Sequence, residues 1–263
     1  MIFFNNIDLT RVGSKMNTSR RINVVIPMAG KGSRFYEKGY KIPKPFIDVH
    51  GKMMIERVLD NLQLPTAKYF LIALQEHIEN YKQYFNKINV NYDSEIIPIY
   101  KTTDGPACTV LATHRQINNE IPLLIANSDQ VVDIKISDYI DDCFKRNLDG
   151  SIMTFKATDP KWSFAKINQK RLVTEVKEKV PISNNATVGI YFFKEGKYFF
   201  NGAIDMIAAA DKTNNEYYVC PIYNYIIRQG GNIGIFEIDP GKMHGTGTPE
   251  DLEEYLFKIK KHA

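Results

Sequence analysis

One short stretch decides the fold, VVIPMAGKGSRF at residues 24–35, and PKPFI follows it at residues 43–47. An apolar strand that ends in a glycine-rich turn lets backbone N–H groups approach a polyanion closely. Arg34 and Lys44 add fixed positive charge beside that turn. We therefore expect a phosphate-binding loop. Its expected nucleotide contacts are Met28, Ala29, Gly30, Lys31, Gly32 and Ser33.

Two better-known phosphate loops do not match this stretch. A Walker A loop needs Ser or Thr directly after its Gly-Lys pair, whereas Gly32 follows Lys31 here. A dinucleotide-binding fingerprint needs a third glycine at the position that Phe35 occupies. What remains is the pattern G-x-G-S-R after a strand, followed by P-K-P-F.

This two-part pattern resembles the signature of the nucleotidylyltransferases that join an NTP to a sugar 1-phosphate, the NDP-sugar pyrophosphorylases. Members carry A-G-x-G-[ST]-R, then P-K, then a Gly-Lys-Pro-Met-like segment, which reads GKMM at residues 51–54 here. The resemblance implies that an acceptor phosphate attacks the α-phosphorus of an NTP and that pyrophosphate leaves. Such a transfer needs positioning and charge neutralisation rather than a covalent nucleophile. We expect Arg34 and Lys44 to hold the triphosphate as catalytic residues.

Composition limits the classes of function. Thirty-four Lys and Arg against 30 Asp and Glu give a formal charge of +4, which leaves no electrostatic footprint for nucleic-acid binding. No apolar run approaches the length of a membrane span, and residues 1–15 lack the apolar core of a signal peptide. The three cysteines are widely spaced, which is typical of reduced thiols and indicates a cytoplasmic protein.

The order of predicted elements indicates an α/β fold. Strands and helices alternate in the first half, with strands at 22–28, 69–74, 95–99 and 122–126 and helices at 54–62, 76–85 and 108–117. The second half is richer in strands, at 151–157, 164–167, 172–178, 187–193 and 232–238, with helices at 202–210, 217–228 and from 249. Strand–helix alternation implies a mostly parallel central sheet with flanking helices.

We therefore expect a single Rossmann-like nucleotidyltransferase domain at residues 21–263, with a smaller mixed β region over the active site. Residues 1–20 are interpreted as a flexible N-terminal extension. Many members of the family carry a C-terminal β-helix, whereas this chain ends in a predicted helix, so it is similar to the short forms.

Asp129 is the expected metal ligand. It follows the strand at 122–126, where the resemblance implies an aspartate that binds Mg²⁺. A carboxylate at the carboxyl end of a strand suits a magnesium ion that bridges phosphates. Capping of the next turn is the alternative. A second metal aspartate of the family falls at Gly245, so His244 is expected to contact the metal or the acceptor instead. The alternatives are that water fills that place and that the segment only caps the final helix through Thr248.

The acceptor side is predicted from shorter matches. Lys179 corresponds to the lysine of an E-K-P motif that meets the acceptor phosphate, although Val180 interrupts the motif and a solvated charge run is the alternative. Gly189 matches a strand glycine that lets the acceptor approach closely. Asn185 and Glu216 are further expected acceptor contacts, as is Trp162 unless it belongs to the core.

The base of the NTP is expected to meet the loop before the helix at 108–117. Thr103 and Gly105 are the candidate nucleotide contacts there, although a plain helix start explains the same residues. Thymidylyl enzymes of the family carry a Gln shortly before this glycine, and residues 99–104 contain none. This difference disfavours dTTP and favours CTP or GTP.

Several functions stay open. The acceptor is a sugar 1-phosphate or a non-sugar phosphate such as phosphocholine or an amino-acid-derived phosphate. The second choice is similar to cytidylyltransferases that decorate surface polysaccharides. A nucleotide-sugar glycosyltransferase would need a D-x-D motif after the fourth strand, and none is present. A non-catalytic regulatory subunit and a homo-oligomer are further possibilities.

Overall fold

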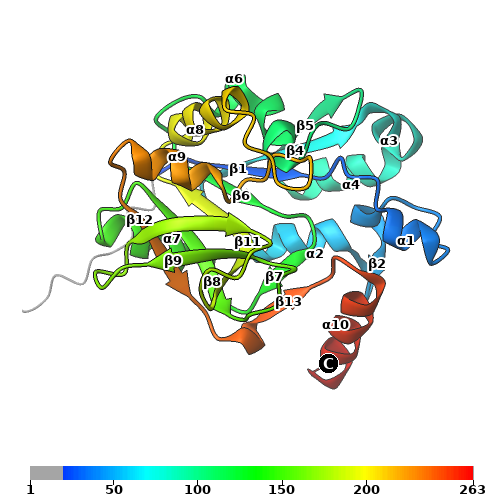
Figure 1. The fold of residues 1–263 in the computed structure, drawn as a ribbon. Helices are drawn as coiled ribbons and strands as arrows, with labels where there is room; N and C mark the ends of the chain where they lie inside the picture. The colour runs from blue at the N-terminus through cyan, green and yellow to red at the C-terminus, as the bar shows by residue number, and fades with distance from the viewer. Residues whose placement is uncertain (1–19, 263) are drawn as a thin grey trace, which may run out of the picture.

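The structure is a computed structural model that describes residues 20–262 (Figure 1). The expected N-terminal extension, residues 1–20, lies outside the described residues except for Arg20.

The described residues form a nine-stranded sheet with helices on both faces (Figure 1). The main path of the sheet runs β10-β9-β11-β6-β1-β4-β5, with β8 beside β11 and β12 beside β8. The bounds are β1 Ile22–Pro27, β4 Ala67–Leu74, β5 Ser94–Ile99, β6 Leu123–Ala126, β8 Gly150–Lys156, β9 Ser163–Ile167, β10 Val173–Glu178, β11 Asn185–Phe193 and β12 Ile233–Glu237.

The helices follow the same chain order. They are α1 Ser33–Glu37, α2 Met54–Asn61, α3 Gln75–Asn80, α4 Lys82–Asn91, α5 Pro106–Val110, α6 His114–Ile117, α7 Ile136–Lys145, α8 Gly196–Ala208, α9 Ile222–Arg228 and α10 Pro249–His262. Single 3₁₀ turns are η1 Lys44–Phe46, η2 Leu111–Thr113 and η3 Pro240–Lys242. Among residues 20–262, none of these helices combines the length and the apolar character needed to cross a membrane.

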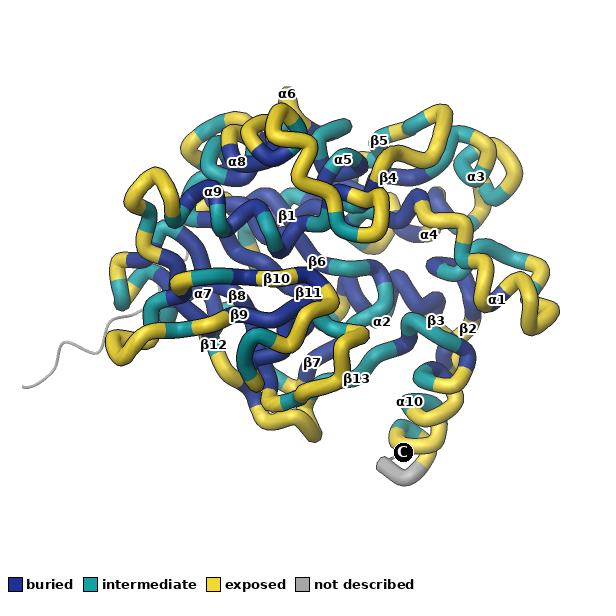
Figure 2. The backbone as a smooth tube through the Cα atoms, viewed as in Figure 1, coloured by how far each residue is buried: buried dark blue, intermediate teal, exposed yellow. Residues whose placement is uncertain are grey.

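The strands β6, β1, β4 and β5 pair in parallel, which confirms the expected α/β architecture. The strands β1, β4 and β6 are largely apolar because both faces of the sheet are covered there, whereas the edge strand β5 is only partly buried (Figure 2). On β1, Val24 and Ile26 face a core that contains Val58 of α2, whereas Val25 faces a second core that contains Phe199 of α8. The loops that follow the parallel strands therefore meet at one edge of the sheet, where ligands of open α/β folds bind.

The mixed β region expected in the second half is present, and it continues the central sheet. Residues 190–193 of β11 run antiparallel to β6, and the other edge of β11 pairs with β8. Ala186 of β11 pairs with Phe164 of β9, beyond the end of β6. The hairpin β9–β10 thus takes the place of β6 along the first half of β11.

Four predicted helices have different bounds. The helix expected at 76–85 is two helices, because Tyr81 (φ −125°, ψ 35°) leaves helical geometry between α3 and α4. The helix expected at 108–117 is α5, η2 and α6 in sequence. The helix expected from 202 begins at Gly196, and Gly202 lies inside it against Ile222 of α9. The helix expected from 217 begins at Ile222.

Two short antiparallel ribbons were not predicted. One pairs β2 (Asp48–Val49) with β3 (Lys52–Met53). The other pairs β7 (Gln130–Val132) with β13 (Met243–Gly245) and so brings the C-terminal segment to the loop after β6. Strands of two or three residues are too short to show the alternation by which strands are recognised in a sequence.

Substitution of Gly196 tests how α8 docks on the rest of the protein. An added Cβ at Gly196 would lie 2.0 Å from the carbonyl oxygen of Ile117, so Gly196→Ala forces the start of α8 away from α6. We expect a loss of about 1–3 kcal/mol in the free energy of unfolding, measured by urea titration. Asn201→Ala changes an exposed position on the same helix and is the matched control. Equal stability of the two variants would show that α8 shifts without cost.

Candidate active site

The loop after β1 lies at the carboxyl edge of the parallel strands. The N–H of Met28 donates to the carbonyl of Ile72 at 2.9 Å, which ties the start of the loop to the end of β4. Gly32 then caps α1 in a left-handed conformation (φ 62°). A Cβ at Gly32 would lie 3.3 Å from the Cβ of Lys44, so the loop packs directly on the PKPFI segment.

Lys44 is fixed by the packing of the residues around it. Lys44 begins η1, and Pro45 and Phe46 in the same turn are buried. The ring of Phe46 stacks on Tyr84 at 5.0 Å and meets Phe85 edge-on at 5.1 Å, which anchors the turn on α4. The Lys44 ammonium therefore projects from a rigid base toward the cleft.

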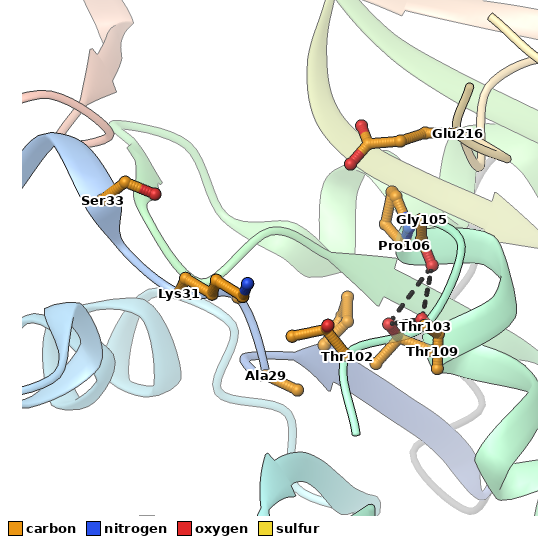
Figure 3. A pocket seen from close by; sticks show the side chains of 11 residues that line it. Ala29, Lys31, Ser33, Thr102, Thr103, Gly105, Pro106, Thr109 and Glu216 are labelled. Atoms are coloured by element: carbon orange, nitrogen blue, oxygen red, sulfur yellow. Dashed lines mark hydrogen bonds between the residues drawn. The ribbon is translucent and has the colours of Figure 1, made fainter. Parts of the chain in front are cut away.

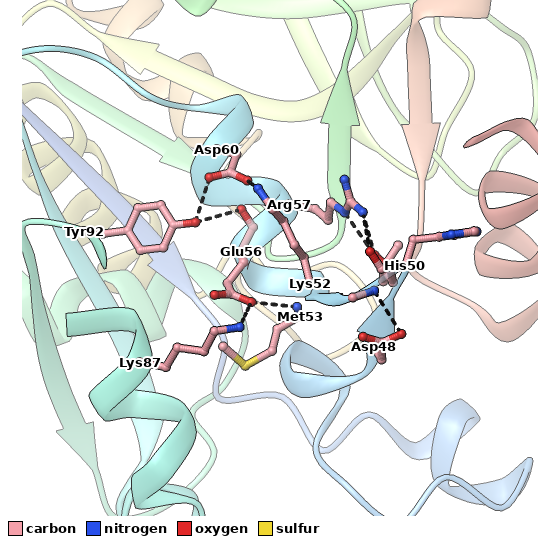
Figure 4. A network of polar contacts seen from close by, with 11 residues as sticks. Asp48, His50, Lys52, Met53, Glu56, Arg57, Asp60, Lys87 and Tyr92 are labelled. Carbon is pink, nitrogen blue, oxygen red and sulfur yellow. Dashed lines mark hydrogen bonds and ion pairs between the residues drawn. The ribbon is translucent and has the colours of Figure 1, made fainter. Parts of the chain in front are cut away.

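A polar network stiffens the segment behind Lys44 (Figure 4). The carboxylate of Glu56, which is only 3% exposed, accepts from the N–H of Met53 at 2.9 Å and from Lys87 Nζ at 2.8 Å. The guanidinium of Arg57 donates to the carbonyls of Val49 and His50. These bonds hold the β2–β3 ribbon on α2, and the ribbon continues directly from η1.

Asp129 lies opposite Lys44, and the two side chains form an ion pair with a Nζ–Oδ2 distance of 2.5 Å. Both are largely buried, with side chains 19% and 16% exposed. The N–H and hydroxyl of Thr246 donate to the backbone carbonyl of Asp129 at 2.8 and 3.0 Å. A Cβ at Gly247 would lie 3.0 Å from Asp129 Oδ2, so the C-terminal loop packs on this carboxylate.

The donor set at Asp129 fits a magnesium ion that arrives with a nucleotide. The second carboxylate oxygen, Oδ1, is buried and has no hydrogen-bond partner among the described residues. Residues 20–262 contain no group of three or more His, Cys, Asp or Glu side chains arranged to hold a metal. A single carboxylate suits Mg²⁺, which typically keeps waters and phosphate oxygens as its other ligands.

A cavity of about 410 Å³ opens on one side of the loop after β1 (Figure 3). Lys31 and Glu216 project from opposite walls, and Thr102 and Thr103 lie between them. The Thr103 hydroxyl donates to the Gly105 carbonyl at 2.9 Å and lies 2.7 Å from the Thr109 hydroxyl. The part of the cavity wall around Thr103 is therefore built from hydroxyl and backbone groups that hydrogen-bond one another.

Gly105 is required by its backbone conformation and its neighbours. Its φ of 116° is unfavourable for residues with a side chain, and a Cβ would lie 2.6 Å from the backbone N and O of Tyr217. The N–H of Ala107 donates to the Tyr217 carbonyl at 2.9 Å, and the N–H of Tyr217 donates to the Asp104 carbonyl at 2.7 Å. These contacts place Glu216, next to Tyr217, over the cavity.

Two further cavities continue the first and form one cleft with it. The middle cavity, about 230 Å³, shares Pro27, Gly30 and Pro106 with the first and contains the Lys44–Asp129 pair. The third cavity, about 190 Å³, shares Pro106, Asn127 and Gln130 with the middle one. The ion pair therefore lies between two end cavities of different lining.

The third cavity is lined by paired hydroxyl and carboxyl groups. Ser163 donates to the Glu178 carboxylate, and the hydroxyls of Thr187 and Tyr191 lie 3.1 Å apart. The rings of Trp162 and Tyr218 are also part of the lining. Lys161 Nζ lies 4.9 Å from the centre of the Trp162 ring.

Gly189 lies where this third cavity meets the loop after β6. Its φ is 91°, and a Cβ would lie 2.2 Å from Gln130 Oε1 and 2.4 Å from Asn127 Nδ2. Because Gly189 has no side chain, the amide groups of Asn127 and Gln130 can pack against it in the cleft wall.

Burial raises the pKa of the Glu178 carboxyl above its usual value, while the hydrogen bond from Ser163 and the charge of Lys179 lower it in part. Lys179 adopts a left-handed backbone conformation (φ 57°) directly after β10. Its Nζ donates to the Tyr218 hydroxyl at 2.9 Å. Lys179 is therefore bonded to Tyr218, which lines the third cavity, but Lys179 does not line that cavity itself.

Most residues predicted from the sequence meet in this cleft. The first cavity is lined by Ala29, Gly30, Lys31, Ser33, Thr103, Gly105 and Glu216. The middle cavity is lined by Met28, Gly30, Gly32, Lys44 and Asp129, and the third by Gly189 and Trp162. Glu216, expected on the acceptor side, thus lines the same cavity as the residues expected to bind nucleotide.

Besides Lys179, three predicted residues line none of these cavities. Arg34 is exposed on α1, and its side chain has no hydrogen-bond or ion-pair partner among the described residues. Asn185 is buried and bonds to the carbonyl of Ala165 and to Lys156 Nζ, so its amide is occupied by the protein. His244 pairs with Asp133 and its ring lies beside that of Tyr255. The structure does not bring these three side chains into the cleft.

Sequence reasoning missed several cleft residues. Asn127 and Gln130 flank Asp129, and their polar character at a strand end was a signal for them. Ser163, Thr187 and Tyr191 come from separate positions on β9 and β11 and look in the sequence like ordinary strand residues. Only the pairing of β9 with β11 brings them together.

Comparison with known proteins places this arrangement in a family. The family model described as "Nucleotidyl transferase" matches residues 23–254. The chain belongs to the nucleotidyl transferase family. This membership confirms the resemblance and the class of enzyme expected from the sequence.

Individual relatives of this nucleotidyl transferase are distant. It is 29% identical to the bifunctional protein GlmU of Methanococcus aeolicus over 184 residues, which cover 68% of the chain and 41% of GlmU, so it spans less than half of that relative. It is 22% identical to the UTP–glucose-1-phosphate uridylyltransferase AglF of Haloferax volcanii, covering 92% of the chain and 98% of AglF. The fold matches that of a nucleoside-diphosphate-sugar pyrophosphorylase from Vibrio cholerae with a TM-score of 0.75 at 24% identity, covering 89% and 99% of the two chains.

Glu178→Gln tests the buried carboxyl of this nucleotidyl transferase. Because burial raises the pKa of Glu178 in the folded state, ionised Glu178 destabilises the fold at pH values above that pKa. Below the pKa of the unfolded state the carboxyl is protonated in both states and the cost disappears. We expect Glu178→Gln to raise the free energy of unfolding at neutral pH, with a gain that shrinks toward zero in acid.

Urea unfolding across the acid-to-neutral range measures this gain. Glu175→Gln, at a less buried position on the same strand, is the control. A gain that grows in acid would contradict the assignment of burial as the cause.

Proposed function

We propose that the protein transfers a nucleotidyl group from an NTP to a phosphorylated small molecule, with release of pyrophosphate. The observation that carries the proposal is the Lys44–Asp129 pair between two cavities of different lining. The first cavity, beside the glycine-rich loop, would take the nucleoside and its triphosphate. The third cavity would take the acceptor, and the two would meet at the ion pair.

In this proposal an oxygen of the acceptor phosphate attacks the α-phosphorus of the NTP. A new P–O bond forms, the bond between the α-phosphorus and the bridging oxygen breaks, and pyrophosphate leaves. Lys44 and Lys31 would neutralise phosphate charge, and the backbone of residues 29–33 would orient the chain of phosphates. Arg34, which is exposed and without a partner, would reach the triphosphate only after a change of side-chain conformation.

Asp129 would hold Mg²⁺ through its unpartnered Oδ1. When bound, the ion supplies positive charge to the phosphates and aligns them. Once the ion is bound to Asp129, the Lys44 ammonium is expected to move from this carboxylate to the phosphates. One carboxylate cannot fully neutralise both the ion and the ammonium.

The lining of the third cavity favours a hydroxylated acceptor such as a sugar 1-phosphate. Hydroxyl and carboxyl groups of Ser163, Glu178, Thr187 and Tyr191 are suited to bind sugar hydroxyls. A trimethylammonium group would instead need open aromatic faces. The ring of Trp162 is already in contact with the ammonium of Lys161, and that of Tyr218 with the ammonium of Lys179. Each Nζ lies 4.9 Å from the ring centre. A phosphocholine-like acceptor is therefore the less favoured alternative.

The relative AglF, whose name gives UTP and glucose 1-phosphate as its substrates, aligns over nearly the whole chain and supports the sugar 1-phosphate choice. CTP and GTP remain the NTPs that the sequence favours. We also propose that the reaction takes place in the cytoplasm and supplies nucleotide-linked units for surface polysaccharides. The free thiols of the three cysteines support the cytoplasmic location.

A screen for pyrophosphate release tests the proposed function. The purified protein is incubated with Mg²⁺, each common NTP in turn, and glucose 1-phosphate, mannose 1-phosphate or phosphocholine. We expect release that requires Mg²⁺, one preferred NTP and a sugar 1-phosphate. Release with phosphocholine alone would contradict the argument from the third cavity. Release of free nucleoside diphosphate from a nucleotide sugar would favour a glycosyltransferase.

Asp129→Asn should lower the rate of pyrophosphate release about 10²–10³-fold, the size typical of lost electrostatic stabilisation at a reacting phosphate. The amide keeps the shape of the side chain and an acceptor for Lys44, but it leaves this largely buried ammonium without a counter-charge, so the melting temperature should fall as well. Asp138→Asn, which removes the same charge from α7, is the matched control. A wild-type rate for Asp129→Asn at saturating Mg²⁺ would assign Asp129 a structural role only.

A further inference from the structure

The β7–β13 ribbon joins the C-terminal segment to the residues that follow Asp129. Met243, His244 and Gly245 pair with Val132, Val131 and Gln130. Figure 1 shows the ribbon below the carboxyl edge of the sheet, with α10 leading away from it. The ribbon fixes where the turn at residues 246–248 lies relative to Asp129.

This turn contacts Asp129 at three points. Thr246 donates twice to the Asp129 carbonyl, and Gly247 packs against the Asp129 carboxylate. Thr248 next accepts the N–H of Asp251 at 3.1 Å and so caps the start of α10. The position of the Asp129 carboxylate thus depends on how firmly β13 stays on β7.

His244 is the polar side chain that can fasten this ribbon. Its Nε2 lies 2.7 Å from Asp133 Oδ2, one residue beyond the end of β7. Its side chain is only 9% exposed, and its ring lies 5.3 Å from that of Tyr255 on α10. Nδ1 is buried and has no hydrogen-bond partner among the described residues, so the ring is anchored through Nε2 and the stacking contact.

We propose that His244 is a positioning residue for Asp129, which it serves by hydrogen bonding to Asp133 and so holding the turn at residues 246–248 against the metal-binding carboxylate. The inference rests on the proposed function, because it takes Asp129 as the metal ligand. It gives His244 a role outside the acceptor site. Residues that orient a ligand carboxylate affect metal affinity without touching the metal.

The matched variants separate the hydrogen bond from the stacking contact. His244→Gln keeps an N–H donor toward Asp133 but has no ring. His244→Phe keeps a ring on Tyr255 but cannot donate. Asp133→Ala removes the acceptor from a side chain that is 62% exposed, so the fold should survive this change. Asp138→Ala removes a carboxylate from α7 and is the control.

Two readouts that do not require turnover test the proposal. Hydrogen exchange of the Thr246 amide reports the contact between the turn and the Asp129 carbonyl, and electron paramagnetic resonance measures Mn²⁺ binding to each variant. We expect Asp133→Ala and His244→Phe to speed the exchange and to weaken Mn²⁺ binding about 10-fold, with melting temperatures near that of the wild type. His244→Gln should restore both properties in large part, and Asp138→Ala should change neither.

The proposal is overturned if the Thr246 amide stays protected and Mn²⁺ binds normally in both Asp133→Ala and His244→Phe. It is also overturned if His244→Phe raises only the KM for the acceptor, since that result would place His244 in the acceptor site. Failure of the proposed function looks different. In that case pyrophosphate is not released by the wild type, whereas the shifts in exchange and Mn²⁺ binding still appear.

Discussion

The cleft depends on one ion pair, between an ammonium and a carboxylate that lie 85 residues apart in the chain. Removing two charges from water costs more than a weak contact returns, so a largely buried pair persists only where the surrounding structure holds both partners in place. Here Lys44 is held by the aromatic packing of η1, and the main chain of Asp129 is held by Thr246. The loops after β1 and β6 and the C-terminal turn therefore converge on a single point.

The ion pair also divides the cleft into two ends with different linings. On one side of the pair the walls carry backbone groups, hydroxyl groups, Lys31 and the carboxylate of Glu216. On the other side the walls carry a buried carboxyl that accepts from Ser163, one pair of hydroxyls and aromatic rings. Pro106 borders all three cavities, so the start of α5 forms part of the wall along the whole cleft.

The sequence predicted the parallel strands because strands buried on both faces read as unbroken apolar runs, such as Val24-Val25-Ile26. The two-part signature of the glycine-rich stretch and PKPFI led to the predictions for the loop and Lys44, and Asp129 was predicted because it follows the apolar strand at 122–126. The β7–β13 ribbon could not be predicted, because three-residue strands carry no periodic signal. The place of His244 could not be predicted either, because its partner Asp133 is distant in sequence and the ribbon alone brings them together.

The irregularity of β11 has a consequence for how such a protein can change. The register of β11 against β8 shifts between Thr187 and Tyr191, around the left-handed Gly189, and the strand changes partners there from β9 to β6. The strand thus belongs to two parts of the sheet, one with β6 and β1 and the other with the hairpin β9–β10. An exchange of that hairpin for another would alter the walls of the third cavity and leave the pairing of β1, β4 and β6 intact. The lining of the third cavity is therefore separable from the Lys44–Asp129 pair, which makes the hairpin a natural unit for engineering.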